Sequence, residues 1–349
     1  MKKMIFAAAS LLVAATAAQA AEQIQIVGSS TVYPFSSYVA EELGATTKTK
    51  TPVVESTGSG GGMKLFCAGA GMDTPDFTNA SRRMKAKEFK KCQKNGIKEI
   101  TEIVVGYDGI AIAQSKSAAP LNLTRKEMML AVAAEVPNKS GDDLIANPYH
   151  YWNEINSKLP HRKITIYGPP TSSGTRDAFE DMILKHITKH MSVYTNLYKA
   201  DHKKNKKYKK FHEIRQDGVY VPSGENDNLI VQKLAKDRSA LGIFGYSYLE
   251  ENSDSIAAAT IEGVAPAPKT VQSGQYKLSR SLYFYIKKSH IRKVPGMKKY
   301  AKLFTSEKMI GDDGACAEIG LIPLPKSMRD HYRSQLANLT NLTAGDFKK

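Results

Sequence analysis

Three short stretches of the sequence combine glycine with hydroxyl side chains, a combination that suits the binding of a small anion. They are Gly28-Ser29-Ser30-Thr31, Thr57-Gly58-Ser59-Gly60-Gly61-Gly62 and Thr171-Ser172-Ser173-Gly174-Thr175. Glycine lets a backbone approach a ligand closely, and Ser or Thr adds a side-chain donor. Each stretch follows a strand-like run and precedes a helical pattern, and a helix start offers unpaired N–H groups with partial positive charge. One such stretch is usually an ordinary N-cap, but three favour a shared anion.

Two arginines are candidates for the charged part of this site. Arg82 follows the strand-like run "DFTNAS", and Arg176 follows Thr175. Guanidinium groups bind tetrahedral oxyanions through paired hydrogen bonds, although either arginine could instead pair with an acid such as Asp177. About eight hydrogen bonds to an ionised ligand, each worth about 1.5 kcal/mol, would contribute about 12 kcal/mol. The loss of ligand freedom costs at least about 4 kcal/mol of this. The remaining binding free energy of about 8 kcal/mol corresponds to micromolar affinity. The expected site needs no metal and no cofactor.

The elements around these stretches indicate an α/β fold. Strand-like runs rich in β-branched or aromatic residues occupy 23–28, 51–56, 99–107, 163–168, 240–246 and 281–288. Helical stripes lie between them, such as Val32, Phe35, Val39 and Leu43 after the first run and 179–191 after the fourth. This alternation predicts parallel sheets, with ligand-binding loops at the carboxyl ends of the strands. Residues 106–109 and 263–278 are candidate passages between two sheets, which would make the first domain discontinuous.

The beginning of the chain has the features of a secretory signal. Lys2 and Lys3 precede an apolar stretch over 4–18, and Ala18-Gln19-Ala20 provides small residues for cleavage after Ala20. The stretch is shorter than the ~20 residues that span a bilayer. The mature protein is therefore expected to be exported, and its 349-residue precursor with 42% hydrophobic residues has room for two folded domains.

The charge of the chain is strongly positive, at +16, and two of these charges leave with the signal. The surplus concentrates in 198–215, where Tyr208 and Phe211 interrupt a run of lysines and arginine. A nucleic-acid-binding surface would require aromatic side chains spaced for stacking on bases, or a known binding motif. A solvated basic surface is the expectation, with no nucleic-acid partner.

The three cysteines fit an oxidising compartment without forming a dense disulfide framework. Cys67 and Cys92 are the natural pair, with two buried thiols as the alternative, and Cys316 is expected to pack as a small hydrophobic residue. A bridge would close a loop of about 26 residues, worth roughly 3.5 kcal/mol in the chain-entropy model.

The sequence resembles the periplasmic phosphate-binding proteins, the soluble receptors of phosphate ABC transporters. The matching stretches run in order along nearly the whole mature chain: "GSSTVYPF" (28–35), "STGSGGG" (56–62), "DFTNASRR" (76–83), "GYDGIAIA" (106–113), "YGPPTSSGTRDAF" (167–179), "SGENDN" (223–228), "LGIFGYSYL" (241–249) and "GLIPLP" (320–325). The resemblance implies a two-lobed type II periplasmic-binding fold with two hinge crossings: signal peptide 1–20, lobe 1 from 21–106 plus 279–349, and lobe 2 from 107–278. It implies a phosphate site formed by Ser30, Thr31, Ser59, Ser173, Gly174 and Thr175. Arg82 and Arg176, selected above from their own positions, are expected to complete this site.

Two departures from the family pattern leave the source of ligand selectivity open. Many members carry an Asp that accepts a proton from phosphate, and Arg82 stands at that position here. An arginine that those members place four residues before the Ser of Ser-Gly-Thr is Pro169 here. A carboxylate in the site repels sulfate, which has no proton to donate. The candidates for another acceptor are Asp108, Glu225 and Asp227.

Two other functions compete with phosphate reception. A receptor for sulfate, molybdate or a phosphonate would keep the fold and change the ligand. An exported phosphatase or other hydrolase would need an activated nucleophile or metal ligands, and the sequence has no G-x-S-x-G or H-E-x-x-H motif. His186 and His190 are four apart but are more simply explained as an exposed helix face. The expected protein is thus a monomeric, periplasmic, non-enzymatic receptor, and the family implies partner permease and ATPase subunits that provide its only link to the membrane.

Overall fold

The computed structural model describes residues 23–204, 213–224 and 227–347. The expected signal peptide, Glu225 and most of the lysine-rich part of 198–215 lie outside these ranges. The strands are β1 (Gln25–Gly28), β2 (Val53–Ser56), β3 (Phe77–Ala80), β4 (Ile100–Ser115), β5 (Asn122–Leu123), β6 (Glu135–Pro137), β7 (Leu144–Ala146), β8 (Ile166–Gly168), β9 (Tyr220–Pro222), β10 (Leu241–Gly245), β11 (Ile256–Ala258), β12 (Thr260–Ile261) and β13 (Ser279–Lys287).

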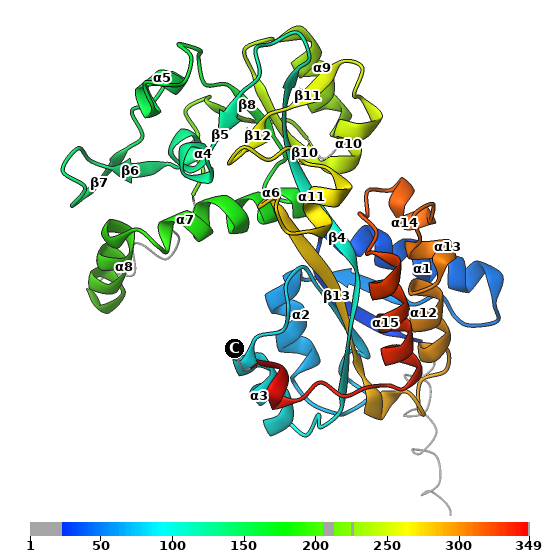
Figure 1. Cartoon of the computed structure of the whole chain (residues 1–349). Helices are drawn as coiled ribbons and strands as arrows, with labels where there is room; N and C mark the ends of the chain where they lie inside the picture. Colours follow the sequence, from blue (N-terminus) through cyan, green and yellow to red (C-terminus); the bar gives the residue numbers. More distant parts are fainter. Residues whose placement is uncertain (1–22, 205–212, 225–226, 348–349) are drawn as a thin grey trace, which may run out of the picture.

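Nine of these strands form the main sheet, β5 with β12 and β6 with β7 form two small sheets, and helices cover both faces of the main sheet (Figure 1). They are α1 (Tyr33–Thr46), α2 (Gly58–Phe66), α3 (Ala86–Lys94), α4 (Arg125–Val132), α5 (Trp152–Ile155), α6 (Gly174–Phe179), α7 (His186–Thr188), α8 (Ser192–Lys204), α9 (Asn228–Lys236), α10 (Tyr246–Glu251), α11 (Pro268–Gln272), α12 (Met297–Phe304), α13 (Glu307–Ile310), α14 (Ala315–Glu318) and α15 (Lys326–Ala337). A π-helical segment, η2 (Glu180–Lys185), joins α6 to α7, and short 3₁₀ turns form η3 (Lys288–His290) and η4 (Ala344–Phe347).

One mixed sheet runs through two bodies, which we call lobe 1 and lobe 2. Its order is β2-β1-β3-β13-β4-β10-β8-β9, with β11 also paired to β4. In lobe 1, β1 is parallel to β2 and β3; in lobe 2, β8 is parallel to β9 and β10. Strands β4 and β13 are antiparallel and run between the two bodies (Figure 1). The predicted α/β class and parallel pairing are thus confirmed, although the sheet also has antiparallel strands.

Strand β4 is longer than the sequence pattern suggests. Residues 106–109 contain two glycines and an aspartate, which made them a candidate break between two strands. The structure keeps one strand through this region, because Gly106, Asp108 and Gly109 pair with Leu282, Arg280 and Ser279 of β13. Beyond Gly109, β4 pairs with β10 over 110–114. A single strand therefore carries the chain from one lobe to the other.

The return passage is made by β13 and not by the proline-rich segment 263–278. Val271, Tyr276 and Leu278 of that segment pack in the core of lobe 2, and the Tyr276 hydroxyl donates to the Ile110 carbonyl at 2.7 Å. A third segment also touches both lobes: Tyr107 and Ile322 exchange backbone hydrogen bonds of 2.8 and 3.0 Å. Leu321 packs in the core of lobe 1 and Ile322 in that of lobe 2.

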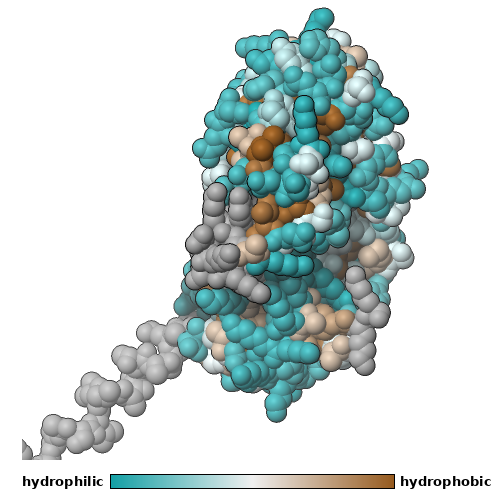
Figure 2. Space-filling view, turned by 90° about the vertical axis from the view of Figure 1, so that its left-hand side faces the viewer, coloured by the Kyte–Doolittle hydropathy of each residue, from teal (hydrophilic) through white to brown (hydrophobic). Residues whose placement is uncertain are grey.

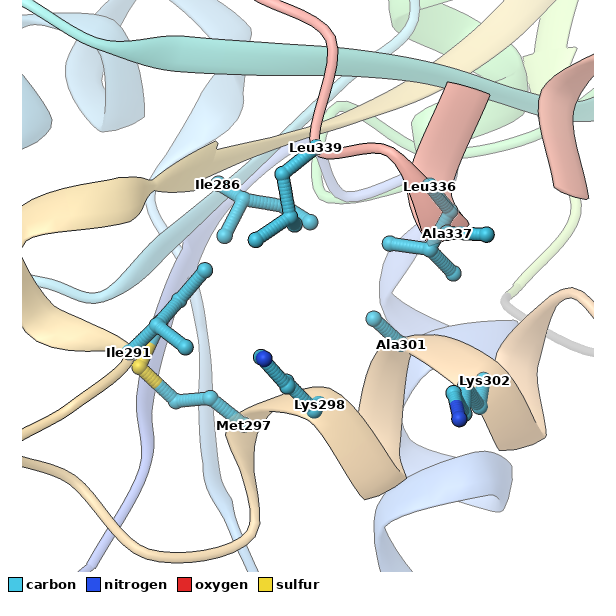
Figure 3. A pocket seen from close by; sticks show the side chains of 9 residues that line it. All are labelled: Ile286, Ile291, Met297, Lys298, Ala301, Lys302, Leu336, Ala337 and Leu339. Carbon is cyan, nitrogen blue, oxygen red and sulfur yellow. The ribbon is translucent and has the colours of Figure 1, made fainter. Parts of the chain in front are cut away.

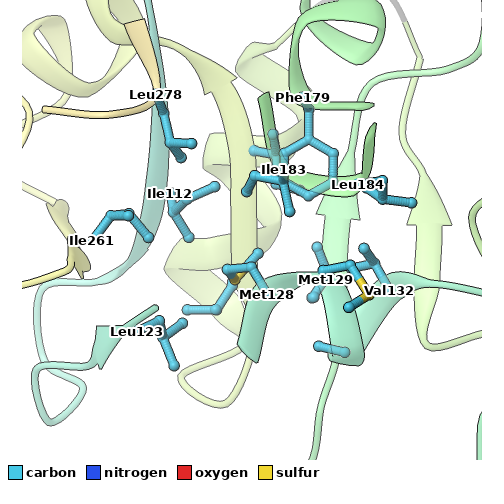
Figure 4. Packing of buried hydrophobic residues seen from close by; sticks show 14 of the residues in the cluster. Ile112, Leu123, Met128, Met129, Val132, Phe179, Ile183, Leu184, Ile261 and Leu278 are labelled. Carbon is cyan, nitrogen blue, oxygen red and sulfur yellow. The ribbon is translucent and has the colours of Figure 1, made fainter. Parts of the chain in front are cut away.

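Each lobe has its own hydrophobic core. The main core of lobe 1 takes residues between 24 and 105 and between 282 and 336. The main core of lobe 2 takes residues between 110 and 278, together with Ile322. Figure 4 shows part of the lobe 2 core, where Met128, Met129 and Val132 of α4 face Phe179, Ile183 and Leu184 of the α6–η2 helix. The predicted helical stripe over 179–191 therefore does bury its apolar face.

Two of the three cysteines are bonded to each other, and the third is buried. Cys67 and Cys92 form the predicted disulfide, and Cys316 is buried in the lobe 1 core, where burial raises the pKa of its thiol to about 12. The face in Figure 2 is mostly hydrophilic, with small apolar patches mainly on the upper body, lobe 2. Within the described ranges, no helix combines the length and apolar character needed to cross a bilayer.

Candidate anion-binding site

The first two glycine-rich stretches meet at the carboxyl edge of the lobe 1 sheet. Strands β2, β1 and β3 are adjacent and parallel, so the loops that follow them emerge on the same side. Gly28 ends β1 with φ +136°, and a Cβ there would lie 2.1 Å from the Asn79 carbonyl oxygen. A Cβ on Gly62 of α2 would lie 2.5 Å from the Gly28 Cα. Only glycine permits both approaches, which bring the start of α2 against the end of β1.

Ser59 connects the second stretch to the end of β3. Its hydroxyl accepts a hydrogen bond from the Ser81 N–H at 3.0 Å and lies 3.1 Å from the Ser81 hydroxyl. Helices α1 and α2 have no side-chain cap at their N-cap residues, Val32 and Thr57. The Thr57 hydroxyl is buried and has no hydrogen-bond partner among the described residues. At the start of α1 the Ser29 hydroxyl accepts from the Val32 N–H at 3.4 Å, whereas the N-cap residue of α2 makes no side-chain cap.

The third stretch reaches these loops from lobe 2. The Thr31 hydroxyl donates to the Gly174 carbonyl at 3.4 Å, across the junction between α1 and α6. A Cβ on Gly174 would lie 2.9 Å from the Thr31 nitrogen and 3.1 Å from the Ser30 hydroxyl. Ser173 caps α6, because its hydroxyl accepts from the Thr175 N–H at 3.2 Å. The first loop therefore contacts the second loop within lobe 1 and the third loop across the lobes.

Arg176, which the sequence analysis placed in the site, makes its contacts within lobe 2. Its guanidinium donates to the Glu180 carboxylate at 2.8 Å and to the Pro169 carbonyl at 3.3 Å, and it lies 4.6 Å from the centre of the Tyr220 ring. Only 8% of its side chain is exposed. Arg176 is therefore bound within lobe 2, because an acid one turn along its own helix and an aromatic face satisfy its charge.

Arg82 also has an acidic partner of its own. Both of its terminal nitrogens donate to the Glu88 carboxylate, at 2.9 and 2.7 Å. This hydrogen bonding raises the pKa of Arg82. Burial works in the opposite direction for Glu88, but the hydrogen bonds from Arg82 and from the Lys85 N–H hold the pKa of Glu88 below its ordinary value. Arg82 remains 30% exposed beside Ser81 and brings charge to the rim of the lobe 1 loops.

A third arginine, which the sequence analysis did not select, lies directly at the junction. Arg280 of β13 donates from Nη2 to the Thr31 hydroxyl at 2.7 Å and lies 3.5 Å from the Gly174 carbonyl oxygen. Its Nε donates to Asp108 of β4 at 3.3 Å. Its side chain is 12% exposed, and that of Asp108 is 15% exposed. One feature of the sequence could have pointed to this pair. Asp108 and Arg280 have opposite charges, and they lie in or next to the two segments expected to connect the lobes, 106–109 and 263–278.

The candidate proton acceptors separate in the structure. Asp108 lies beside Arg280, next to Thr31 and Gly174. Asp227 stands at the start of α9 and accepts from the Gly245 N–H at 3.4 Å, within lobe 2. Asp177, in the first turn of α6, has a pKa raised by burial and by the charges of Glu180 and Asp181, while Arg280 acts in the opposite direction. Asp108 is thus the candidate that lies beside the contact between the first and third loops.

A separate cavity in lobe 1 is unsuited to a dehydrated anion. It has a volume of about 150 Å³ and lies between β13, α12 and α15 (Figure 3). Its lining is aliphatic apart from Lys298 and Lys302, and it presents no convergent amides or hydroxyls of the kind found at the junction.

Within the described ranges, no cluster of three or more His, Cys, Asp or Glu side chains could hold a metal ion. His186 at the start of α7 and His190 in the turn that follows this helix instead contact each other.

Two α/β lobes joined by long strands, with anion-suited helix starts meeting where the lobes join, define a solute-binding protein of the type II periplasmic-binding fold. Residues 13–308 match the family described as "PBP superfamily domain", and the chain belongs to this family.

Several known proteins are similar to this chain over most of its length. Protein SphX of Synechococcus elongatus is 30% identical over 304 residues, which cover 85% of this chain and 76% of that protein. Phosphate-binding protein PstS of Staphylococcus saprophyticus is 28% identical over 328 residues, 92% of this chain and 86% of that protein. The crystal structure of a possible phosphate-binding protein from Planctomyces limnophilus has a TM-score of 0.70 and 29% identity, covering 92% of this chain and 99% of that chain.

Proposed function

We propose that this protein binds inorganic phosphate between its lobes and delivers it to an ABC importer. The observation that carries the proposal is the contact between Thr31 and Gly174, which joins hydroxyl- and glycine-rich helix starts from different lobes beside Arg280. A ligand held at this junction makes bonds to both lobes and so favours their closed arrangement. The similarity to proteins named as phosphate-binding supports phosphate as that ligand.

The ligand set proposed here consists of backbone amides and hydroxyls. Ser30 and Thr31 at α1 and Ser59 at α2 serve from lobe 1, and Ser173, Gly174 and Thr175 at α6 serve from lobe 2. Neutral donors that are fixed before binding stabilise a dianion without adding a competing counter-charge. Arg82 lies at the rim, where Glu88 occupies its terminal nitrogens and offsets its charge. Arg176 supports the third loop through Pro169 and Glu180.

The proposal also covers the setting in which the protein works. The signal peptide is removed after Ala20, and the mature chain acts as a monomer in the periplasm. Lobe 1 consists of 21–106 and 279–349, and lobe 2 of 107–278, so that closure turns about 106–109 and the start of β13. The closed protein docks on the permease and ATPase pair, which is its only contact with the membrane. It binds phosphate without converting it.

Isothermal titration of the purified mature protein with phosphate, arsenate and sulfate tests this function. Phosphate should bind with micromolar or tighter affinity, and excess sulfate should not displace it. Ser59→Ala should weaken phosphate binding about tenfold, because a hydrogen bond to a charged group is worth roughly 1.5 kcal/mol. Ser253→Ala removes an exposed hydroxyl and is the matched control. Absence of phosphate binding, preferential binding of sulfate, molybdate or a phosphonate, or turnover of a phosphate ester would each contradict the proposal.

A further inference from the structure

The cation that bridges the two lobes is Arg280, and its position is the starting point for an inference that rests on the proposed function. Arg280 lies on β13, the return strand, and its Nη2 reaches Thr31 in lobe 1 at 2.7 Å and the Gly174 carbonyl in lobe 2 at 3.5 Å. The other two candidate arginines are held by Glu88 and Glu180, within single lobes. Of these three arginines, Arg280 is the one with hydrogen bonds to loops of both lobes.

We propose that Arg280 binds the anion directly and that Asp108 determines which anion is accepted. Nη1 of Arg280 has no hydrogen-bond partner among the described residues, and the bond from Nη2 to Gly174 is long. A guanidinium offers two parallel donors along one edge, which match two oxygens of a tetrahedral oxyanion. With its side chain 12% exposed, Arg280 binds in a partly dehydrated setting, where charge interactions are stronger than in bulk water.

Asp108 holds Arg280 in place through the sheet. The two residues are directly opposite each other on β4 and β13, and the Nε of Arg280 donates to Asp108 at 3.3 Å. Cross-strand neighbours of opposite charge stabilise each other and restrict each other's rotamers. Since Nε is occupied by Asp108, the terminal nitrogens face Thr31 and Gly174. Asp108 is therefore a positioning residue for Arg280.

The same carboxylate gives the site a means of discrimination. Asp108 places a negative charge beside the bound anion, which disfavours a fully ionised guest such as sulfate. Phosphate and arsenate carry a proton at neutral pH, and that proton can be donated to a carboxylate oxygen. A protonated anion therefore forms a hydrogen bond with Asp108, whereas a fully ionised anion is only repelled by it. The selective acid of this protein thus lies on the crossing strand β4 and not after β3.

Titration calorimetry with phosphate and sulfate, on the wild type and on matched variants, tests both roles. Arg280→Gln should weaken phosphate binding at least 100-fold and Arg280→Lys less, because lysine keeps the charge but loses the paired donors. Arg292→Gln removes an exposed arginine of the same charge and should have no effect. Asp108→Asn should lower the ratio of phosphate to sulfate affinity at least tenfold, whereas exposed Asp313→Asn should leave this ratio unchanged.

The outcomes separate this inference from the function on which it rests. A wild type that binds no phosphate overturns both. A wild type that binds phosphate, with Arg280→Gln equal to Arg292→Gln, overturns the role of Arg280 alone. An unchanged affinity ratio in Asp108→Asn overturns the role of Asp108. Circular dichroism establishes that each variant is folded, and Arg280→Lys decides the role of Arg280 if the glutamine variant does not fold.

Discussion

Gly174 of lobe 2 lies so close to Thr31 of lobe 1 that a Cβ added to the glycine would come within 2.9 Å of the Thr31 nitrogen. That distance is shorter than real Cβ contacts, and the nearest atom belongs to the backbone, so the lobes must separate to accommodate the added Cβ. We expect Gly174→Ala to weaken phosphate binding at least tenfold while each lobe stays folded. Calorimetry gives the affinity, and small-angle scattering of the phosphate-saturated variant gives the lobe separation.

A glycine in open surroundings is the matched control for this substitution. A Cβ on Gly245 would meet only the Ser247 hydroxyl, at 4.0 Å, and its φ of −65° suits any residue. Gly245→Ala should therefore bind phosphate as the wild type does. Equal affinities for the two alanine variants would show that the contact between the lobes does not belong to the binding-competent state.

The contacts of Arg176 lead to the prediction that it stabilises lobe 2 more than it binds phosphate. Arg176→Met removes the buried guanidinium that binds the Glu180 carboxylate, which costs on the order of 3 kcal/mol of unfolding free energy. The double variant Arg176→Met/Glu180→Met should regain most of that loss, because no uncompensated charge remains. Urea unfolding of the wild type, both single variants and the double variant closes the cycle. A stable Arg176→Met protein that has lost phosphate binding would instead support Arg176 as a ligand.

The sequence predicted the parts of the site that local chemistry determines. A β-branched run followed by glycine and hydroxyls is recognisable without the fold, so the loops containing Thr31, Ser59 and Thr175 could be selected and expected to converge. The acidic partner of Arg176 could also have been predicted from the sequence, since Glu180 is four residues from Arg176 within one helical segment. That spacing favours a pair within the helix and outweighs the position beside Thr175.

The continuity of β4 and the pairing of Arg280 with Asp108 could not be predicted, because both depend on pairing between strands that are distant in the sequence. Gly106 and Gly109 normally interrupt a strand, but β13, which pairs with them, keeps β4 continuous. Arg280 and Asp108 are 172 positions apart, and only the register of β13 on β4 places them together. Such a register depends on the packing of the whole lobe and leaves no local pattern in either segment.

The disulfide between Cys67 and Cys92 should contribute measurably to the stability of lobe 1. The cysteines are 25 positions apart, and closing a loop of this size in the unfolded chain is worth roughly 3.5 kcal/mol. Urea unfolding with and without a phosphine reductant should show this loss in the wild type and in Cys316→Ala, since Cys316 is not bonded. The double variant Cys67→Ala/Cys92→Ala should be insensitive to reductant. A wild type with the same unfolding free energy under both conditions would contradict the prediction.

Lys287 should make the stability of lobe 1 depend on pH in the alkaline range. Its side chain is fully buried, its ammonium group donates to the Gly69 carbonyl at 2.9 Å and to the Thr74 hydroxyl at 2.6 Å, and burial lowers its pKa to about 8 against the opposing charges of Asp76 and Asp73. The unfolded chain has the ordinary lysine pKa of 10.5. Between these two values the unfolded state binds more protons, so the unfolding free energy rises with pH, by at most about 1.4 kcal/mol per unit.

Comparison with Lys287→Met isolates this contribution from those of other groups. Urea unfolding at pH 7, 8, 9 and 9.5 stays below the ordinary tyrosine pKa of about 10, and the start of tyrosine ionisation is common to the wild type and the variant. The wild type should gain on the order of 1 kcal/mol relative to Lys287→Met between pH 8 and 9.5, and the difference should be constant below pH 7.5, where lysine is protonated in both states. Lys64→Met removes an exposed lysine and should follow the wild type at every pH. Parallel curves for the wild type and Lys287→Met would mean that Lys287 keeps an ordinary pKa despite its burial against Phe66, whose ring centre lies 4.9 Å from the ammonium nitrogen.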